Sequence, residues 1–463
     1  MTGDRGGELI AFLKSKRWFG DKTKVIRGAR LRERIPVVWP NADRDFAVAR
    51  ADVETDDGTS TYQLVLGAES EPIGDALENE QFRRGLIDAF AHGAAFDSGR
   101  ARWIIQSEGK RMLVAPPAST ITLSKAEQSN TSVLVEGEAI LKLFRRLEPG
   151  VHPDVEVTRF LTIDRQFLHT PVLLGTIRFE DAEGTTTAGM LQELVPQAMD
   201  GWSFALECTR EHFGNGRGTD MPFLNEAEQL GIVTRALHET LASGAPGSAF
   251  APTQVQETDV KAWTDATARM ARRSLESLRG AVDSIPGKHA DAARALIADR
   301  FTELVAGWGR DLANDAGLKT RVHGDYHLGQ VLRSAANQFL IIDFEGEPAR
   351  PLAERRALQS PLRDVAGMLR SFAYLAAVGA ANGKAGVDRA SRWEQDARAA
   401  FFRGYFADVD TPVRGLLPRD RRNAERLIRL FEAEKVFYEL QYELDHRPDW
   451  AWIPLRGITA LTT

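Results

Sequence analysis

The stretch that decides the fold is VHGDYHLGQ at residues 322–330, together with FLIIDFEGEP at residues 339–348. The first segment is polar and contains glycine, which predicts a loop. The second begins as an apolar run, which predicts a buried strand, and ends in closely spaced carboxylates. Both segments carry acidic residues. They interrupt a part of the chain in which the spacing of apolar residues otherwise predicts helices.

These two segments have the residue types that phosphoryl transfer needs. The protein does little covalent work in that reaction, so position and charge dominate. One carboxylate, Asp325, can accept the proton of an attacking hydroxyl. Asp343 can hold a Mg²⁺ that bridges nucleotide phosphates, the Gln330 amide oxygen can complete that metal site, and Glu345 can also reach Mg²⁺. An aspartate in a glycine-containing loop is also a common turn former, but the complete order of residues favours catalysis.

A nucleotide-binding part should then lie upstream, with a lysine on a strand. Lys142 occupies that position in AILKLF, residues 139–144. A charge inside an apolar strand is costly unless it is paired, although an edge strand can also carry such a lysine to prevent aggregation. The helix predicted for 153–166 offers Glu156 as the partner, with Asp154 as the second candidate.

Two further segments are candidates for nucleotide contacts. EQSNTS at 127–132 can cap phosphates with hydroxyls, amides and backbone N–H groups, although an ordinary surface turn would have the same composition. MLQELV at 190–195 predicts a strand. If the chain is a kinase, this strand is the hinge between its lobes, where backbone groups around Glu193 and Val195 meet adenine. The expected nucleotide-binding residues of these segments are Ser129, Asn130, Thr131, Ser132, Gln192, Glu193 and Val195.

Composition excludes several classes of protein. The chain has 463 residues and a formal net charge of −6, which argues against wrapping nucleic acid because that requires many cations. A single cysteine, Cys208, can form neither an intrachain disulfide nor a cysteine zinc site. No apolar run is long enough for a membrane span or a signal peptide, so we expect a cytoplasmic protein.

Periodicity predicts an α+β protein in three parts. Residues 1–95 mix helix and short strands, 96–196 are strand-rich with one helix, and 197–463 are mostly helical around the loop and strand quoted first. The motifs quoted above resemble those of a kinase family, and this resemblance implies a bilobal fold: an N-terminal α+β cap subdomain, a β-rich nucleotide lobe, and a helical C-lobe with the catalytic loop and sugar site.

The HGD loop and the following DFE strand end resemble the catalytic core of the aminoglycoside phosphotransferase-like kinases, relatives of the eukaryotic protein kinases. The resemblance implies that Asp325 is the catalytic base, that Gln330 and Asp343 bind Mg²⁺, and that ATP is the donor. Gln330 departs from the asparagine that is commoner in the wider family, although its amide oxygen can still reach the metal.

An ordered set of further motifs resembles bacterial maltokinases, including the kinase part of trehalose synthase fusions. The set comprises RWFG (17–20), EQSNTS (127–132), FRRL (144–147), PDVEV (153–157), DFEGEP (343–348), PLAERR (351–356), RPDW (447–450) and IPL (453–455). The resemblance implies transfer of the ATP γ-phosphate to maltose, giving maltose 1-phosphate. Glucosamine kinases share this architecture, so glucosamine, giving glucosamine 6-phosphate, stays open as the acceptor.

Sugar contacts should come from carboxylates, amides and aromatic faces. The candidates are His323, Asp325, Glu443, Arg447 and Trp450. The last three could equally belong to a helix end packed on the core.

Two competing hypotheses are a kinase for a different small molecule and a pseudokinase that serves as a binding module. The complete catalytic set argues against the pseudokinase. As partners we expect a small sugar, no nucleic acid and no membrane, with a functional link to trehalose or α-glucan enzymes. The chain could be a monomer or a homodimer.

Overall fold

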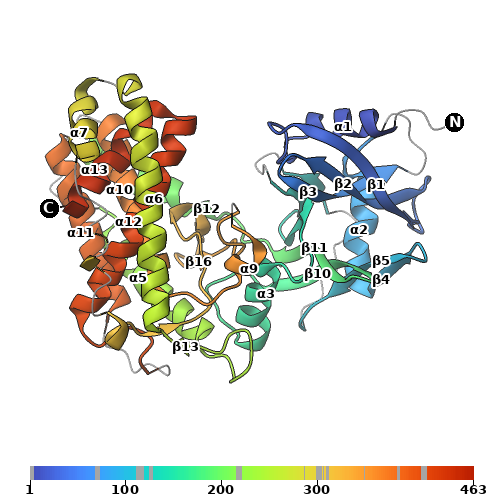
Figure 1. Ribbon diagram of the computed structural model, residues 1–463. Helices are drawn as coiled ribbons and strands as arrows, with labels where there is room; N and C mark the ends of the chain where they lie inside the picture. Colours follow the sequence, from blue (N-terminus) through green and yellow to red (C-terminus); the bar gives the residue numbers. More distant parts are fainter. Residues whose placement is uncertain are drawn as a thin grey trace. The chain divides into compact units, whose positions relative to one another are not determined.

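A computed structural model of the chain (Figure 1) describes residues 5–67, 73–110, 119–124, 129–214, 222–285, 287–298, 305, 307–308, 312–348, 350–382, 386–407 and 414–462. The chain forms two compact units, Met1–Gln197 and Ala198–Thr463. The expected α+β class is confirmed. In the part of the chain that the structure describes, no helix has the length and apolarity needed to cross a membrane.

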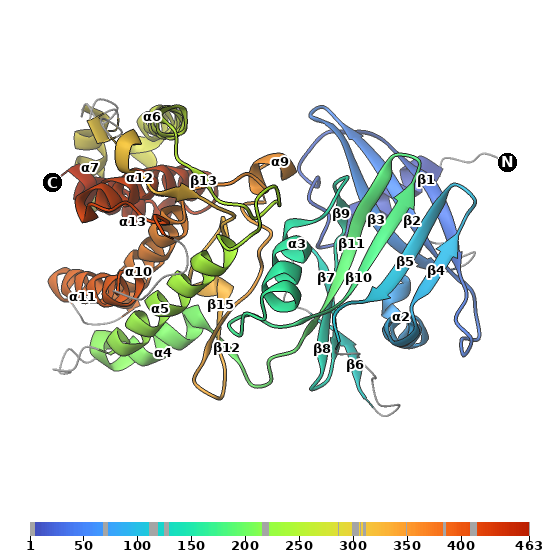
Figure 2. The same ribbon diagram turned by 90° about the horizontal axis from the view of Figure 1, so that it is seen from below.

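The first unit contains two antiparallel sheets. Its elements are α1 (Arg5–Ser15), β1 (Ile26–Val37), β2 (Phe46–Thr55), β3 (Gly58–Gly67), α2 (Glu80–His92), β4 (Ala94–Asp97), β5 (Ala101–Ser107), β6 (Ile121–Leu123), β7 (Thr131–Val135), β8 (Ala139–Leu143), β9 (Arg146–Leu147), α3 (Pro153–Arg159), β10 (Leu173–Asp181) and β11 (Gly184–Glu193). One sheet has the order β1-β2-β3-β9, and the other has the order β4-β5-β10-β11-β8-β7-β6 (Figure 2).

The two sheets share one core. Strand β2 is buried along almost its whole length, so both of its faces are covered. Phe46 and Val48 belong to a cluster that extends through α2 to β8 and β11, whereas Ala49 and Ala51 belong to a second cluster beneath α1. Helix α2 begins where the Asn79 side chain accepts from the N–H of Phe82, as expected for an N-cap. Cap and nucleotide lobe are therefore packed as one body.

Arg145, just after β8, ties the cap to the nucleotide lobe. Its guanidinium is 1% exposed and lies 2.6 Å from the Asp75 carboxylate. It also donates from Nε to the Thr131 hydroxyl at 2.8 Å and lies over the Trp18 ring at 4.6 Å. The Gln63 side chain also donates to the backbone carbonyls of Phe144, just after β8, and of Ala188, within β11. The RWFG tryptophan therefore touches a side chain that also holds the predicted phosphate segment.

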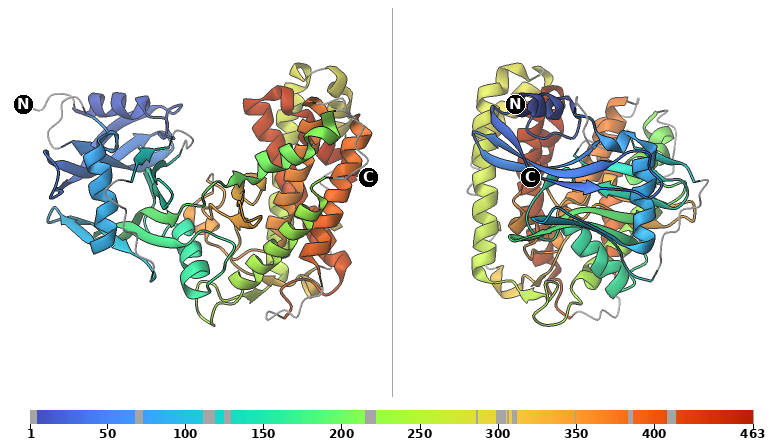
Figure 3. Two further views of the ribbon diagram at one scale, coloured as in Figure 1. Left: turned by 180° about the vertical axis from the view of Figure 1, so that it is seen from behind. Right: turned by 90° about the vertical axis from the view of Figure 1, so that its right-hand side faces the viewer.

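The second unit is mostly helical. Its elements are β12 (Met199–Asp200), α4 (Gly201–Gly214), α5 (Leu224–Leu241), β13 (Thr253–Gln254), α6 (Glu257–Ala281), α7 (Gly287–Ala298), β14 (Leu318–Lys319), β15 (Val331–Arg333), β16 (Phe339–Ile341), α9 (Leu352–Arg355), α10 (Leu362–Asn382), α11 (Val387–Tyr405), α12 (Arg421–His446) and α13 (Trp452–Thr462). Helix α12 packs against both α6 and α10, and α11 packs against α5 and α10. Helices α6 and α12 run side by side in Figure 1 and Figure 3.

The catalytic segment lies among these helices. Strands β15 and β16 form a hairpin, with Val331 opposite Ile341 and Arg333 opposite Phe339. The loop at 322–330 leads into this hairpin through a short 3-10 turn. Helix α10 approaches the loop closely, since a Cβ at Gly367 would lie 2.5 Å from the Tyr326 carbonyl oxygen. Only glycine leaves the space for this contact.

Candidate active site

In the first unit, Lys142 lies on β8 in the middle of the larger sheet. It is opposite Met190 of β11 and Ser132 of β7, and Gln192 is two residues farther along β11. Because directly paired residues and residues two apart share a sheet face, these four side chains point to the same side. The register therefore places three predicted nucleotide residues, Lys142, Ser132 and Gln192, on one face.

The ion pair recorded for Lys142 is with Asp154 of α3, at 3.2 Å between Nζ and Oδ2. Asp154 is 1% exposed and its N–H donates to the His152 Nδ1 that caps the helix. The structure thus pairs the lysine with the second of the two acids that the sequence offered. Glu156, half-buried on the same helix, stays a prediction for this role.

Two polar side chains on the Lys142 face are buried without a partner among the described residues. Within that part of the chain the Ser132 hydroxyl and the Gln192 amide nitrogen lack hydrogen bonds, and both residues are at most 3% exposed. A buried unsatisfied polar atom costs about 1–3 kcal/mol, so such atoms are rare away from functional sites.

Of the predicted phosphate segment, Ser129 and Asn130 form a bend before β7, while Glu127 and Gln128 lie outside the described residues. In the predicted adenine strand, the Glu193 N–H donates to the Val172 carbonyl and the Leu194 N–H donates to the Glu138 carbonyl. Both N–H groups are therefore already hydrogen-bonded within the protein. Val195 is half-buried just after the strand end.

In the second unit, the loop that carries Asp325 is held by a buried carboxylate on α10. Asp364 accepts from the backbone N–H groups of His323, at 2.7 Å, and Gly324, at 2.9 Å. His238 Nε2 lies 3.1 Å from the same carboxylate. Burial alone would raise the pKa of Asp364, but the hydrogen bonds from His238 and the loop lower it below its ordinary value. Gly324 has φ +84°, which only glycine adopts without strain.

His323 links the loop to the predicted metal strand. Its Nε2 lies 2.9 Å from the Ile342 carbonyl oxygen, and its ring contacts Phe344. The Ile342 N–H donates to the Gln330 carbonyl at 3.0 Å, which ties the same two segments a second time. The segments that carry Asp325, Gln330 and Asp343 are therefore neighbours, whereas His323 is 1% exposed and serves as a link.

Asp343 has an unusual backbone. Its φ is +70°, in the left-handed region that residues other than glycine seldom adopt. Such strain is stored preferentially at functional sites. Among the described residues no group of three His, Cys, Asp or Glu side chains is placed to hold a metal. One or two carboxylates and an amide suffice to hold Mg²⁺, because Mg²⁺ keeps several waters.

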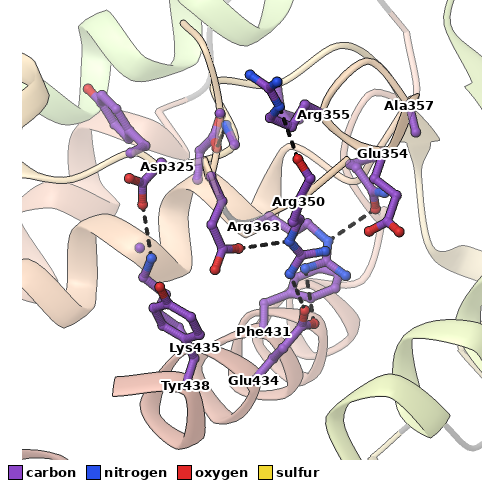
Figure 4. A pocket seen from close by; sticks show the side chains of 18 of the residues that line it. Asp325, Arg350, Glu354, Arg355, Ala357, Arg363, Phe431, Glu434, Lys435 and Tyr438 are labelled. Atoms are coloured by element: carbon purple, nitrogen blue, oxygen red, sulfur yellow. Dashed lines mark hydrogen bonds and ion pairs between the residues drawn. The ribbon is translucent and has the colours of Figure 1, made fainter. Parts of the chain in front are cut away.

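Asp325 lies in the wall of a pocket (Figure 4). Its Oδ1 accepts from Lys435 Nζ of α12 at 2.9 Å, and His327 Nε2 lies 3.9 Å from Oδ2. Burial would raise the pKa of Asp325, but the Lys435 ammonium and, more weakly, His327 lower it below its ordinary value. Burial would likewise lower the pKa of Lys435, but the carboxylates of Asp325 and Glu347 raise it.

Other charges of this pocket are also paired within the chain. Arg350 lies between Glu347, at 2.7 Å, and Glu434, at 2.9 Å. Arg363 contacts Glu434 at 3.0 Å and stacks on the Phe431 ring. Lys435, Glu434 and Arg350 were not predicted. The sequence feature that could have pointed to Glu434 and Lys435 is the run FEAEK at 431–435, where charged residues interrupt the apolar positions of a predicted helix.

The predicted sugar residues of the tail do not line this pocket. Glu443 is 1% exposed and accepts from Tyr374 and from Arg447, at 3.1 and 2.7 Å. Arg447 lies 5.1 Å from the ring of Trp450, which is exposed. The three residues form their own cluster at the end of α12. Their role in sugar binding stays a prediction, as does the metal role of Glu345, whose carbonyl accepts from Arg355.

With this geometry in hand, comparison with known proteins identifies a domain and a class. Residues 12–95 match the maltokinase N-terminal cap domain. The chain therefore carries that domain.

Two glucosamine kinases are similar over most of the chain. The enzyme from Streptacidiphilus jiangxiensis is 29% identical over 345 residues, 72% of each chain. The one from Mycolicibacterium smegmatis (strain ATCC 700084 / mc(2)155) is 27% identical over 337 residues, 72% of this chain and 78% of the relative. A solved glucosamine kinase in complex with glucosamine, ADP and inorganic phosphate has a TM-score of 0.69 at 23% identity, with full coverage of both chains. The expected kinase-like fold and enzyme class, a phosphotransferase with a hydroxyl acceptor, are confirmed.

Proposed function

We propose that the chain is an ATP- and Mg²⁺-dependent sugar kinase whose acceptor is maltose and whose product is maltose 1-phosphate. The observation that carries the proposal is the Asp325 carboxylate in a pocket wall, kept ionised by Lys435 and joined through its loop to the segments of Gln330 and Asp343. An ionised carboxylate at a pocket is what a general base for a hydroxyl requires.

The proposed reaction uses the second unit for chemistry. Asp325 takes the proton of the attacking hydroxyl as the new O–P bond forms and the bond between the β- and γ-phosphates breaks, releasing ADP. The hard oxygen donors of Asp343 and Gln330, with Glu345 nearby in sequence, fit Mg²⁺. When bound, the metal supplies charge that neutralises the transferring phosphoryl group.

The first unit would hold the nucleotide. Lys142, fixed by Asp154, would contact phosphates together with the segment Ser129–Ser132. Gln192, Glu193 and Val195 would lie against the adenine. The Ser132 hydroxyl and the Gln192 amide, which have no hydrogen bond within the described residues, support this assignment because a ligand could satisfy them. We retain the division 1–95, 96–196 and 197–463 as the proposed functional parts.

We prefer maltose to glucosamine because three pocket carboxylates already have cations from the chain: Asp325 pairs with Lys435, and Glu347 and Glu434 pair with arginines. A neutral sugar needs no free carboxylate as a counter-charge, so this pairing is compatible with maltose as the acceptor. The cap domain also supports maltose. Glucosamine, the substrate named for the similar enzymes, is the second candidate.

The test is a panel of sugars incubated with ATP and Mg²⁺ and followed by ADP release, with the product identified by ³¹P NMR. We expect maltose 1-phosphate. Phosphorylation of glucosamine but not of maltose would overturn the acceptor. No ADP release with any sugar, despite nucleotide binding, would favour the pseudokinase hypothesis.

A further inference from the structure

A hollow in the first unit contains none of the residues assigned above to nucleotide, metal or sugar. It is formed by one side of α2, the connection from β1 to β2 and the start of β4, and its volume is about 510 Å³. Small-molecule sites typically have about 300–1,000 Å³. Helix α2 lies beside β4 and β5 in Figure 1 and Figure 2. We call this space the α2 hollow; its lining includes Trp39, Arg84, Gly85, Asp88, His92 and Phe96.

A polar stripe of α2 lines one part of the α2 hollow. Arg84, Asp88 and His92 are four residues apart, so they follow one another along one side of the helix. The half-buried Arg84 donates from Nη2 to the Ser119 carbonyl at 2.6 Å. Within the described residues, no ion pair involves the exposed Asp88 carboxylate. The stripe therefore offers a cation and a separate anion one helical turn apart.

The rest of the lining is mostly apolar. Val38 and Pro40, before β2, and Phe96 of β4 contribute to it together with Trp39. The Phe96 and Trp39 rings are 5.1 Å apart and nearly perpendicular. A Cβ at Gly85 would lie 2.4 Å from Trp39 Cγ, so the indole packs directly on the α2 backbone. An apolar wall with a few polar groups is typical of a site for a small organic molecule.

Trp39 gives an independent indication of a ligand. The residue is 6% exposed, and its indole N–H has no hydrogen-bond partner in the part of the chain that the structure describes. A buried tryptophan N–H usually has a partner. A buried donor without one, on a residue that lines a hollow, indicates an acceptor that a bound molecule would bring.

We propose that the α2 hollow binds an aromatic α-amino acid. Its carboxylate would accept from Arg84 and from the Trp39 indole, and its ammonium would pair with Asp88. Its ring would lie against the apolar wall. A zwitterion suits both charges at once, whereas Asp88 would repel a carboxylate alone and Arg84 would repel an amine alone. This proposal is independent of the proposed kinase function, because the α2 hollow shares no residue with that site.

The test measures binding of L-phenylalanine to the full-length protein by isothermal titration, up to about 10 mM ligand. The indole N–H cross-peak of Trp39 is followed in ¹H–¹⁵N spectra during the same titration. Hydrocinnamate, which is phenylalanine without its amino group, is the comparison ligand. Asp88→Asn should weaken phenylalanine about fivefold and leave hydrocinnamate within about twofold. Glu80→Gln is the matched control, because Glu80 is an exposed acid of the same helix that does not line the α2 hollow.

The outcomes separate specific from incidental binding. A shifted Trp39 cross-peak, a preference for phenylalanine over hydrocinnamate, and loss of that preference in Asp88→Asn but not in Glu80→Gln support the site. Absence of binding, binding that leaves the Trp39 cross-peak in place, or equal affinity for the two ligands overturns it. Because Asp88 is exposed, Asp88→Asn should keep the wild-type Tm, and kinase activity plays no part in the result.

Discussion

Lys435 Nζ lies 2.9 Å from Asp325 Oδ1, so the proposed catalytic base is bound by a cation that is 110 residues away in the sequence. The pair keeps the carboxylate ionised at low solvent exposure. It also joins the loop of the proposed base to α12, which contributes Phe431, Glu434, Lys435 and Tyr438 to the pocket wall.

Replacing the base should nearly abolish turnover. We expect Asp325→Asn to lower kcat about 10²–10⁴-fold, because the amide cannot accept the hydroxyl proton. Nucleotide binding, measured by isothermal titration with ADP and Mg²⁺, should persist. Asp291→Asn, at an exposed acid of α7, is the control. Full activity of Asp325→Asn would rule out the assigned role.

Removing the cation should change the pH profile. The folded-state pKa of Asp325 is lowered by Lys435 against a burial effect that raises it. In Lys435→Met the burial effect remains and is opposed only by the weaker effects of His327 and His323, so the pKa of Asp325 should rise. The acid limb of kcat/KM against pH should therefore move to higher pH. Lys261→Met, at an exposed position of α6, should leave the profile unchanged; coincident limbs for Lys435→Met and wild type would contradict the proposal.

The buried pair of Lys142 and Asp154 should contribute both to stability and to nucleotide binding. Removal of one partner of a buried ion pair costs about 3–5 kcal/mol. We expect Asp154→Asn to lower Tm and raise the KM for ATP at least about tenfold, measured by thermal denaturation and steady-state kinetics. Glu156→Gln is the comparison on the same helix. A larger effect of Glu156→Gln would assign the lysine partner to Glu156.

The left-handed backbone of Asp343 allows stability to be separated from activity. Asp343→Gly and Asp343→Ala both remove the carboxylate, but only glycine adopts φ +70° without strain. We expect both variants to be inactive, with the glycine variant about 1 kcal/mol more stable in urea denaturation. Equal stability would show that the backbone of this residue relaxes when the carboxylate is removed.

Asp364 should contribute stability that depends on pH. Its folded-state pKa is lowered, so its contribution is present above the ordinary aspartate pKa and is lost as the pH falls through the folded value. At neutral pH, Asp364→Asn should cost about 2–3 kcal/mol, since three charge-assisted hydrogen bonds are affected. The Tm difference from wild type should narrow below about pH 4. Asp396→Asn on α11 is the exposed control, and a difference that stays constant with pH would exclude an ionised Asp364.

Much of the fold could be predicted because its signals are local. The spacing of apolar residues in the sequence predicts strands at the positions of β2, β3, β10 and β11. The residues EG at 136–137 predict the turn between β7 and β8, and Gly137 has φ +72° there. The loop of Asp325 and the strand before Asp343 could be placed because catalytic chemistry requires those residue types in that order.

What could not be predicted depends on long-range packing. Nothing near Lys435 in the sequence shows that α12 passes beside Asp325, and nothing near Asp364 shows that it holds the loop of His323. The tail was another difficulty: RPDW and IPL carry two prolines, yet Trp452–Thr462 forms α13. Pro454 lies in the first turn of that helix, where proline is tolerated.

The contacts of the buried Arg145 make the cap necessary for the stability of the rest of the first unit. A fragment beginning at residue 96 would lose Asp75, Trp18 and the Gln63 carbonyl that contact the guanidinium. A buried cation without its counter-ion costs several kcal/mol, a large part of the stability of a typical domain. The chain should therefore not be truncated at residue 95, where the cap-domain match ends. A substitution at Asp75, Trp18 or Gln63 would need a compensating substitution at or near Arg145.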